Sequence, residues 1–425
     1  MKNKIVSGIE NKYVLLIHCR NPYLNNAGSE NLIISHIKLF NERNISSLVV
    51  FPINITKMGL NIHRWGMSIE DKFLGVYSTN DIIKIINEIN LSSKCKGIFI
   101  HSLLFMDFTE LYHLVSFRSK VVLYLHDFCT CCSQFNLLKN KEIFCGNARI
   151  YDEKCSDCCF YLSAKKMKAS AEQFLSSIEN VAIIAPSEFV KVLWCDAFPK
   201  YADKVTVVNH KKLVGNYSDN MSVIQPDDRL RIAYVGQDIR TKGYDKWLAM
   251  TDALRDNYRY EFYHLGRLET QNSHITYREV SIINDGPDAM IKALRELKIH
   301  AVVLFSTAPE TYSYTYFESL ASNCFVITSD ISGNIAVETR KRKNGVVLEN
   351  STTALLGYLS NTDKVIADIN DFRKRNLCGP LALENNDSIV ELLNDEKSIP
   401  LNPAKKVGKL QTFIAEILYR IRFRV

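Results

Sequence analysis

The sequence AVVLFSTAPETYSYTYFESLA, residues 301–321, places two carboxylates across a turn between a strand and a helix. The apolar run Ala301–Phe305 predicts a buried strand, and Phe317–Ala321 predicts a helix. Glu310 and Glu318 span this turn, where a parallel α/β sheet binds its ligands. The free N–H groups at the start of the helix suit an anionic phosphate, and carboxylates accept hydrogen bonds from sugar hydroxyls. Because two glutamates at one spacing are common by chance, the prediction of a site depends on the residues around them.

The residues downstream continue a recognisable order of elements. Leu320-Ala321-Ser322-Asn323 is followed by a strand at Cys324–Thr328, by Ser332-Gly333 and by Asn344-Gly345-Val346-Val347. In this order and spacing the chain resembles the family 4 retaining glycosyltransferases, which have the two-domain GT-B fold. Its variant Glu-Thr-Tyr-Ser-Tyr-Thr is similar to one seen in bacterial surface-polysaccharide and O-antigen enzymes. The resemblance implies a GT-B fold and transfer of a sugar from a nucleotide-diphosphate donor.

Along the whole chain, short apolar runs alternate with longer amphipathic ones, which is typical of parallel sheets flanked by helices. The expected strands are Tyr13–His18, Ser47–Phe51, Gly97–His101, Lys120–Leu125, Val181–Ala185, Val205–Asn209, Leu230–Gly236, Glu261–Gly266, Ile275–Val280, Ala301–Phe305, Phe325–Thr328 and Val346–Leu348. The polar, turn-rich stretch 215–228 predicts an interdomain linker. We therefore expect an α/β protein of the GT-B class, with two Rossmann-like parallel-sheet domains that face a cleft. The expected parts are an acceptor-side domain (1–214), a nucleotide-sugar-binding domain (228–396), and a basic amphipathic tail or crossing helix (397–425).

Length and composition exclude several other classes of protein. With 425 residues the chain is long enough for two domains. Its first residues lack the apolar core of a signal peptide, and no apolar run approaches the ~18–20 residues that span a bilayer. We therefore expect a cytoplasmic protein whose 12 cysteines are mostly reduced. The net charge of +7 suits an anionic partner or simply aids solubility. Because the chain lacks a nucleic-acid recognition motif, we expect no nucleic acid as partner.

The donor side of the expected site begins where the strand Leu230–Gly236 ends in a basic loop before a helix. In the family, an arginine and a lysine of this loop neutralise the donor diphosphate. Lys242 falls on the family lysine, whereas Gln237 stands at the arginine position and brings no charge. Stabilisation of the leaving group would then depend on Lys242, with Arg240 as a compensating cation. The alternative is a surface loop with an incidental lysine.

The resemblance also assigns roles to the two glutamates and to residues between them. Glu318 would hold the nucleotide ribose, and Glu310 would meet the transferred sugar. Tyr312, Ser313 and Tyr314 would offer backbone N–H groups to the phosphates. Fixed cations and helix-end N–H groups stabilise the charge that grows on a departing diphosphate, so no metal or other cofactor is expected for catalysis. The alternative for Glu310 is a core or capping carboxylate.

Three residues of the first half match family positions that follow strands. Gly28, in Ala27-Gly28-Ser29-Glu30, keeps one glycine of a turn that lets the backbone approach the donor, although an ordinary helix start has a similar sequence. His126 follows the run Val121–Leu125 and would contact the transferred sugar, unless it is only a histidine satisfied at a strand end. Ser187 matches a family strand end, where its role as a helix N-cap explains it without any chemistry.

A cluster of seven cysteines lies in the first half of the chain. They are Cys129, Cys131, Cys132, Cys145, Cys155, Cys158 and Cys159. Four of them match a pattern found in a related subset of the family, although Ser133 replaces a proline. These four are Cys132, Cys145, Cys155 and Cys158. Four thiolates on one loop are enough for a tetrahedral structural zinc, which would brace a loop beside the acceptor cleft. Free packed thiols and disulfides are the alternatives, and disulfides are less favoured in the cytoplasm.

The end of the chain combines an apolar stripe with many cations. The stripe, at helical spacing, consists of Leu410, Phe413, Ile414, Ile417, Leu418 and Ile421, and the cations are Lys405, Lys406, Lys409, Arg420, Arg422 and Arg424. Such a helix fits a bilayer interface, and it equally fits a GT-B crossing helix packed on the first domain. With a second basic segment at Lys165, Lys166 and Lys168, it would allow peripheral binding to the inner face of the plasma membrane.

The favoured interpretation is a retaining glycosyltransferase with Glu310, His126 and Lys242 as catalytic residues. It would move a sugar from a nucleotide-diphosphate sugar to a growing, lipid-linked cell-surface glycan. Retention would come from front-face attack assisted by the departing diphosphate, so no protein nucleophile is expected. The alternative is a non-catalytic GT-B subunit that binds glycan or stabilises a partner transferase. Gln237 and the single glycine of the turn at Gly28 favour this alternative.

Overall fold

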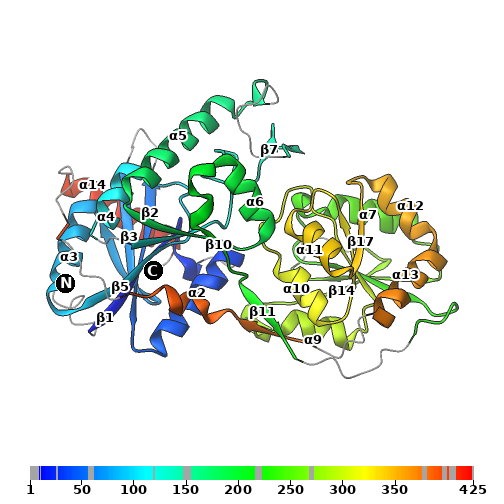
Figure 1. Ribbon diagram of the computed structural model, residues 1–425. Coiled ribbons are helices and arrows are strands. Elements are labelled where there is room, and N and C mark those ends of the chain that lie inside the picture. The colour runs from blue at the N-terminus through cyan, green and yellow to red at the C-terminus, as the bar shows by residue number, and fades with distance from the viewer. Residues whose placement is uncertain are drawn as a thin grey trace.

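The protein, described here from a computed structural model, consists of two α/β domains that lie side by side (Figure 1). The structure describes residues 9, 11–24, 27–55, 62–117, 120–146, 155–215, 223–267, 272–375, 381–394, 400–401 and 408–423. Each domain has one sheet with helices on both faces, as expected for the α/β class.

Domain one is built on a sheet with the strand order β10-β9-β6-β5-β1-β2-β3-β4. Its strands are β1 (Lys12–Ile17), β2 (Ser46–Ile55), β3 (Ile62–Ile69), β4 (Lys72–Tyr77), β5 (Lys94–Ile100), β6 (Lys120–Tyr124), β9 (Asn180–Ala185) and β10 (Val205–Val207). The strands from β10 to β2 are parallel, and β3 and β4 add an antiparallel edge. In β1, Leu15 and Ile17 face one half of the core, and Val14 and Leu16 face the other. Because both faces of the sheet are covered, its central strands are continuous apolar runs.

Three of the five α-helices that follow in domain one start at side chains that cap them. The five helices are α2 (Gly28–Asn41), α3 (Thr79–Ser92), α4 (Phe108–Val115), α5 (Tyr161–Ser177) and α6 (Glu188–Ala197), with short 3-10 helices η1 (Pro22–Leu24) and η3 (Pro199–Lys204). Ser78, Asp107 and Ser187 accept backbone N–H groups at the starts of α3, α4 and α6. Between β6 and α5, the antiparallel hairpin of β7 (Leu138–Lys139) and β8 (Ile143–Phe144) lies on the side that faces domain two (Figure 1).

Domain two has an all-parallel sheet with the strand order β14-β13-β12-β15-β16-β17. Its strands are β12 (Leu230–Val235), β13 (Tyr260–Leu265), β14 (Ile275–Arg278), β15 (Ala301–Leu304), β16 (Phe325–Ser329) and β17 (Gly345–Leu348). Its helices are η4 (Arg240–Lys242), α7 (Tyr244–Ala253), α8 (Ile282–Asp285), α9 (Ala289–Glu296), α10 (Tyr314–Ala321), α11 (Asn334–Arg342), α12 (Thr352–Ser360) and α13 (Thr362–Arg375). The strand order reverses between β12 and β15, and ligands of such sheets bind at the carboxyl ends of the strands at this point. The strands expected from the apolar runs are all present in the two sheets.

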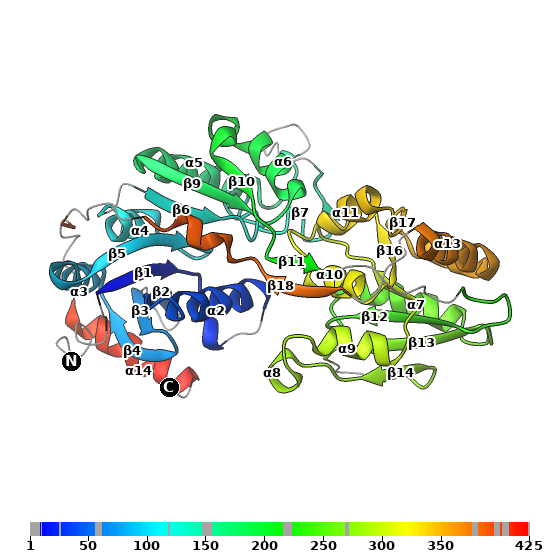
Figure 2. The same cartoon turned by 60° about the horizontal axis from the view of Figure 1, so that its bottom comes forward.

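The chain passes between the domains twice, through the antiparallel pair β11 (Lys211–Val214) and β18 (Ala382–Asn385), as Figure 2 shows. After β18 it returns to domain one, where η5 (Asp387–Leu392) places Ile389 in the core. Asn394 then donates its backbone N–H to the carbonyl of Lys96 at 2.9 Å. The range 228–396 suggested by the sequence therefore includes a final segment that packs on domain one. Half of the expected linker, residues 216–222, lies outside the described residues.

The last described helix, α14 (Lys409–Phe423), packs on β2, β3 and β4 of domain one. Tyr419 is buried and stacks on Phe73 with ring centroids 5.0 Å apart. Arg64 donates from Nε to Thr412 Oγ1 at 2.8 Å. None of the described helices has both the length and the apolar character needed to cross a membrane.

The apolar stripe expected on this helix faces mostly away from the domain. Leu410 is 70% exposed, Phe413 is 62% exposed and Ile421 is 71% exposed. The buried face is a different one, formed by Ala415 and Tyr419. Three of the expected cations, Lys405, Lys406 and Arg424, lie outside the described residues.

Candidate active site

The donor loop of domain two follows β12 and leads through η4 to α7. Gly243 connects η4 to α7 with a left-handed φ of 82°, and a Cβ here would lie 2.1 Å from the carbonyl oxygen of Phe305. Only glycine accommodates both this backbone conformation and this close approach. The glycine thus allows the loop to pack against the end of β15 and brings Lys242 to the neighbouring loop.

Lys242 and Glu310 form an ion pair, with Nζ 2.5 Å from Oε1. The hydroxyl of Ser306 donates to the same carboxylate oxygen at 3.0 Å. The Lys242 side chain is 48% exposed and that of Glu310 is 13% exposed. A pair this open to solvent stabilises the fold by at most about 1 kcal/mol. A ligand that offers its own charge and hydroxyls to the two side chains can therefore replace it.

The backbone of Glu310 is fixed by the start of α11. Glu310 and Gly333 form a β-bridge, and Asn334 donates its N–H to the Glu310 carbonyl at 2.8 Å. Gly333 has a φ of 62°, and a Cβ there would lie 2.6 Å from the Glu310 nitrogen. Gly333, which the sequence offered only as part of a motif, thus sets the position of the Glu310 carboxylate.

Glu318 is buried in α10, and this burial raises its pKa to about 7 although the charge of Lys211 acts in the opposite direction. Ser313 is the N-cap of the helix, since its hydroxyl accepts the Tyr316 N–H at 3.2 Å. The helix therefore begins at Tyr314, three residues before the expected start. Its first turn directs the positive end of the helix dipole toward the loop that carries Glu310.

The loop between Glu310 and α10 forms the seam with domain one. Thr311 donates from its hydroxyl to the His126 carbonyl at 2.8 Å, and Ser187 donates to the Thr311 carbonyl at 2.8 Å. The Tyr314 hydroxyl donates to the Gly28 carbonyl at 3.3 Å. The structure thus brings Gly28, His126 and the Glu310 loop together. Ser187 also caps α6, as expected, but no sequence pattern indicated its contact across the seam.

His126 belongs to a stack of rings at the carboxyl edge of the domain-one sheet. Its Nε2 lies 3.1 Å from His101 Nδ1, and its ring is nearly parallel to that of Tyr124, with centroids 5.5 Å apart. Burial lowers the pKa of His126 to about 3, so the imidazole is neutral. His210 packs against His126 and, across the seam, against Tyr312 at 4.3 Å between centroids. These rings therefore present a neutral, aromatic surface to the site.

A buried ion pair lies in the first turn of α2. Glu30 Oε1 is 3.3 Å from His18 Nε2 and 2.8 Å from Arg20 Nε. Burial alone would lower the pKa of His18, but hydrogen bonds with Cys19 and Glu30 outweigh it and raise the pKa to about 9. Both Glu30 and His18 were visible in the sequence, but no local pattern indicated that they pair.

The other expected donor residues lie further from the glutamates. Gln237 is exposed, and its carbonyl accepts the Tyr234 hydroxyl at 2.7 Å. Arg240 is 88% exposed, with Nε 3.9 Å from Asp245 Oδ2. Of the three loop residues expected to bind the donor, Lys242 alone has a described contact with Glu310.

The four cysteines of the expected zinc site lie close enough for their thiols to influence one another. Burial raises the pKa of Cys132 and Cys145 to about 11, and the neighbouring thiols of Cys155 and Cys158 act in the same direction. This donor set suits zinc. As the side chains are placed, however, no three His, Cys, Asp or Glu residues in the described part of the chain are positioned to hold a metal ion.

Comparison with known proteins extends only to the fold. No protein-family model and no curated protein matches the sequence. Among solved structures, a sucrose-phosphate synthase from Thermosynechococcus elongatus matches with a TM-score of 0.52 and 11% identity, over 97% of this chain and 100% of that one. A glycosyltransferase from Rickettsia africae matches with a TM-score of 0.50 and 13% identity, over 86% of this chain and 92% of that one. The chain has the GT-B fold. In this fold the seam described above lies between the two Rossmann-like domains, with Lys242 and Glu310 on one side and His126 on the other.

Proposed function

We propose that the protein is a retaining glycosyltransferase that takes its sugar from a nucleotide-diphosphate donor. The observation that carries the proposal is the solvent-accessible pair of Lys242 and Glu310 at the carboxyl edge of the domain-two sheet. The loop that follows Glu310 is hydrogen-bonded to His126. The Lys242–Glu310 pair and the backbone of His126 therefore both adjoin the Glu310 loop at the seam of a GT-B fold, which supports a ligand held by both domains.

In this proposal each group has one task. The ammonium of Lys242 leaves Glu310 and binds the donor diphosphate, together with the N–H groups at the start of α10. Glu310 then accepts a hydroxyl of the transferred sugar, and Glu318 accepts the hydroxyls of the ribose. The acceptor oxygen bonds to the anomeric carbon on the face from which the diphosphate departs, and its proton passes to the leaving phosphate oxygen. Retention follows because attack and departure share one face.

The test is a nucleotide-sugar panel against the purified chain, with thermal shift and donor hydrolysis as readouts. We expect one donor to raise the melting temperature and to be hydrolysed slowly in the absence of acceptor. Binding without any hydrolysis or transfer would favour a non-catalytic GT-B subunit, which the neutral Gln237 in the donor loop also favours. Binding of no nucleotide sugar would contradict the donor assignment.

We further propose that the acceptor is a lipid-linked surface glycan and that α14 attaches the protein to the membrane that carries it. Support comes from the outward stripe of Phe413, Ile417 and Ile421, which domain one leaves exposed. The basic segment of α5 lies near the other edge of the sheet (Figure 2), so attachment depends on α14 rather than on both segments. Flotation with anionic liposomes tests this: Phe413→Ser with Ile417→Ser should abolish salt-resistant binding, and equal flotation of this variant and the wild type would contradict it.

A structural zinc held by Cys132, Cys145, Cys155 and Cys158 is a separate proposal, supported by the gathering of the four thiols. The metal would hold the loop that carries β7 and β8 and would take no part in transfer. Short exposure to EDTA should therefore leave activity intact, whereas complete removal of zinc should lower the melting temperature. Zinc-free protein by elemental analysis after mild purification would contradict the proposal.

A further inference from the structure

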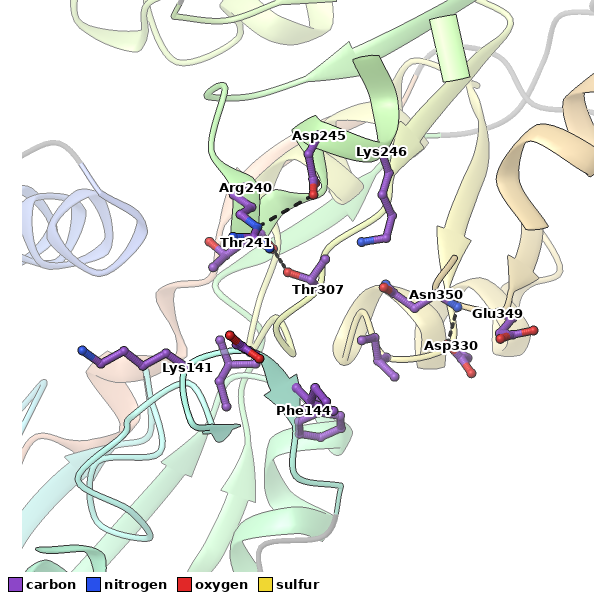
Figure 3. A pocket seen from close by; sticks show the side chains of 14 residues that line it. Lys141, Phe144, Arg240, Thr241, Asp245, Lys246, Thr307, Asp330, Glu349 and Asn350 are labelled. Atoms are coloured by element: carbon purple, nitrogen blue, oxygen red, sulfur yellow. Dashed lines mark hydrogen bonds and ion pairs between the residues drawn. The ribbon is translucent and has the colours of Figure 1, made fainter. Parts of the chain in front are cut away.

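A cavity of about 530 Å³ lies between the hairpin β7–β8 of domain one and the loops after β12, β15, β16 and β17 of domain two (Figure 3). Ligand sites for small molecules have volumes of about 300–1,000 Å³. The cavity has two walls from different domains: Phe144 stands on the hairpin side, and Lys246, Asp330, Glu349 and Asn350 stand on the domain-two side.

The cavity adjoins the Lys242–Glu310 pair through short connections. Thr241, which lines it, directly precedes Lys242, and its carbonyl accepts the N–H of Thr307 at 2.9 Å. Asn350 Nδ2 donates to the carbonyl of Ser306 at 3.0 Å. The hydroxyl of Ser306 in turn holds the Glu310 carboxylate. A ligand in the cavity would therefore lie next to the residues proposed to hold the donor sugar.

The lining fits a neutral polyhydroxyl ligand. Four carboxylates and three cations line the cavity, so neither sign of charge dominates, and a polyanion would gain little there. The side chains of Lys246 and Glu349 make no hydrogen bond or ion pair with the described residues, which leaves one donor and one acceptor group for hydroxyls. The ring of Phe144 offers an apolar surface opposite them (Figure 3).

The hairpin wall is held in place by the cysteine-rich loop. Asn140, at the tip of the hairpin, accepts the N–H of Cys159 on its side-chain oxygen at 2.9 Å. Lys139 pairs with Asp157 at 2.6 Å, and Cys145 donates its N–H to the Leu137 carbonyl at 2.9 Å. These contacts thus help to hold the hairpin that carries Phe144.

We infer that this cavity binds the terminal sugar of the acceptor glycan, as a neutral monosaccharide unit that lies between Phe144 and Glu349. The inference rests on the proposed function, because it places the acceptor beside the donor sugar. It gives the cysteine-rich loop a role in choosing the acceptor, and it gives domain two a part in acceptor binding as well as in donor binding.

The test uses saturation-transfer NMR on the full chain, without donor, and a panel of methyl glycosides. The panel contains both anomers of glucose, galactose, mannose, N-acetylglucosamine and N-acetylgalactosamine. We expect at least one glycoside to bind the wild type, and Phe144→Ala and Glu349→Gln each to weaken its binding by about 10-fold. The matched controls are Tyr258→Ala, an aromatic residue that is 75% exposed, and Glu179→Gln, an exposed carboxylate. Both controls should bind as the wild type does.

Two results would overturn the inference: no glycoside of the panel binds the wild type, or binding survives both substitutions unchanged. The two experiments distinguish a failure of this inference from a failure of the proposed function. If the nucleotide-sugar panel finds a donor but Phe144→Ala and Glu349→Gln leave glycoside binding unchanged, the acceptor binds elsewhere and the proposed transferase activity stands. If glycosides bind through Phe144 and Glu349 but no nucleotide sugar binds, the cavity is a sugar site and the donor assignment is wrong.

Discussion

The two walls of the seam differ in the charge and the solvent exposure of their side chains. On the domain-two wall, Lys242 and Glu310 are ionic and open to solvent, and Arg240 is almost fully exposed. On the domain-one wall, His101 and His210 are buried and His126 is half-buried, and desolvation lowers the pKa of each imidazole. A wall of the first kind binds a charged ligand in a salt-dependent manner. A wall of the second kind acts through shape and neutral hydrogen bonds, so the two walls should respond differently to substitution, pH and salt.

The largest effect concerns Glu318, which belongs to domain two but is buried like the domain-one histidines. Its pKa rises from 4.5 to about 7 on folding because burial disfavours the charged form. Between these values the folded state holds the proton more tightly than the unfolded state, so stability falls as the pH rises through this window. Relative to Glu318→Gln, the wild type should lose up to about 3 kcal/mol of unfolding free energy between pH 4 and pH 8.

Urea denaturation at several pH values measures this difference. The exposed carboxylate variant Glu179→Gln should show no such pH-dependent gain over the wild type. If the unfolding free energies of the wild type and of Glu318→Gln changed in parallel with pH, Glu318 would ionise as a solvated carboxylate. It would then resemble the charged residues Lys242 and Glu310 rather than the domain-one histidines.

The second prediction compares how substitutions on the two walls change donor binding, turnover and salt dependence. Lys242→Ala and Glu318→Ala should each weaken binding of the identified donor and reduce turnover at least ~10-fold, since a hydrogen bond to a charged group contributes about 1.5–3 kcal/mol. Lys242→Ala should also flatten the dependence of donor affinity on salt. His126→Asn should reduce turnover while it leaves that salt dependence as in the wild type.

Isothermal titration at low and high salt separates the two walls, with the exposed Lys212→Ala as control. Donor affinity that is unchanged in both Lys242→Ala and Glu318→Ala would remove the donor assignment. A salt dependence altered equally by Lys242→Ala and His126→Asn would remove the distinction between the walls.

The smallest effect concerns the neutral contacts that join the walls. Thr311→Val removes the hydroxyl that donates to the His126 carbonyl and keeps the shape of the side chain. A neutral hydrogen bond contributes about 0.5–1.5 kcal/mol, so turnover should fall by a few-fold, with donor affinity and salt dependence preserved. Thr352→Val, at the first position of α12 and away from the seam, is the matched control. Steady-state kinetics would contradict the prediction if both variants had wild-type turnover.

Much of the architecture could be predicted because it is encoded in local apolar patterns. The strands of the two parallel sheets are runs such as Tyr13–Ile17 and Ala301–Leu304, which both faces of a covered sheet require to be apolar. The edge strands β3 and β4 were not predicted, because they include polar and charged residues such as Arg64 and Lys72. The pair β11–β18 joins residues that are far apart in the chain, and neither strand is apolar enough to be recognised alone.

The contacts of the candidate site also divide into those that local sequence predicted and those that it did not. Lys242 and Glu310 were expected to belong to one donor site, and the structure brings the two side chains into contact. The contacts of Ser187 with Thr311 and of Glu30 with His18 depend on how distant segments pack, and no spacing encodes them. The cavity is the clearest case, because its two walls come from a cysteine-rich hairpin and from four loops of another domain.

The side-by-side strands β11 and β18 give the molecule a modular construction. Val214 pairs with Ala382, so the two ends of domain two lie next to each other, and the chain on both sides of it packs into domain one. Domain two is thus an insertion with a single point of entry and exit. Under the proposed function, exchange of everything between these two strands for the equivalent part of another GT-B protein would alter which nucleotide sugar is used while the domain-one scaffold stays intact. A cut in β11 or in β18 would break one of the two covalent connections between the domains. The resulting two pieces would then have to assemble as separate chains.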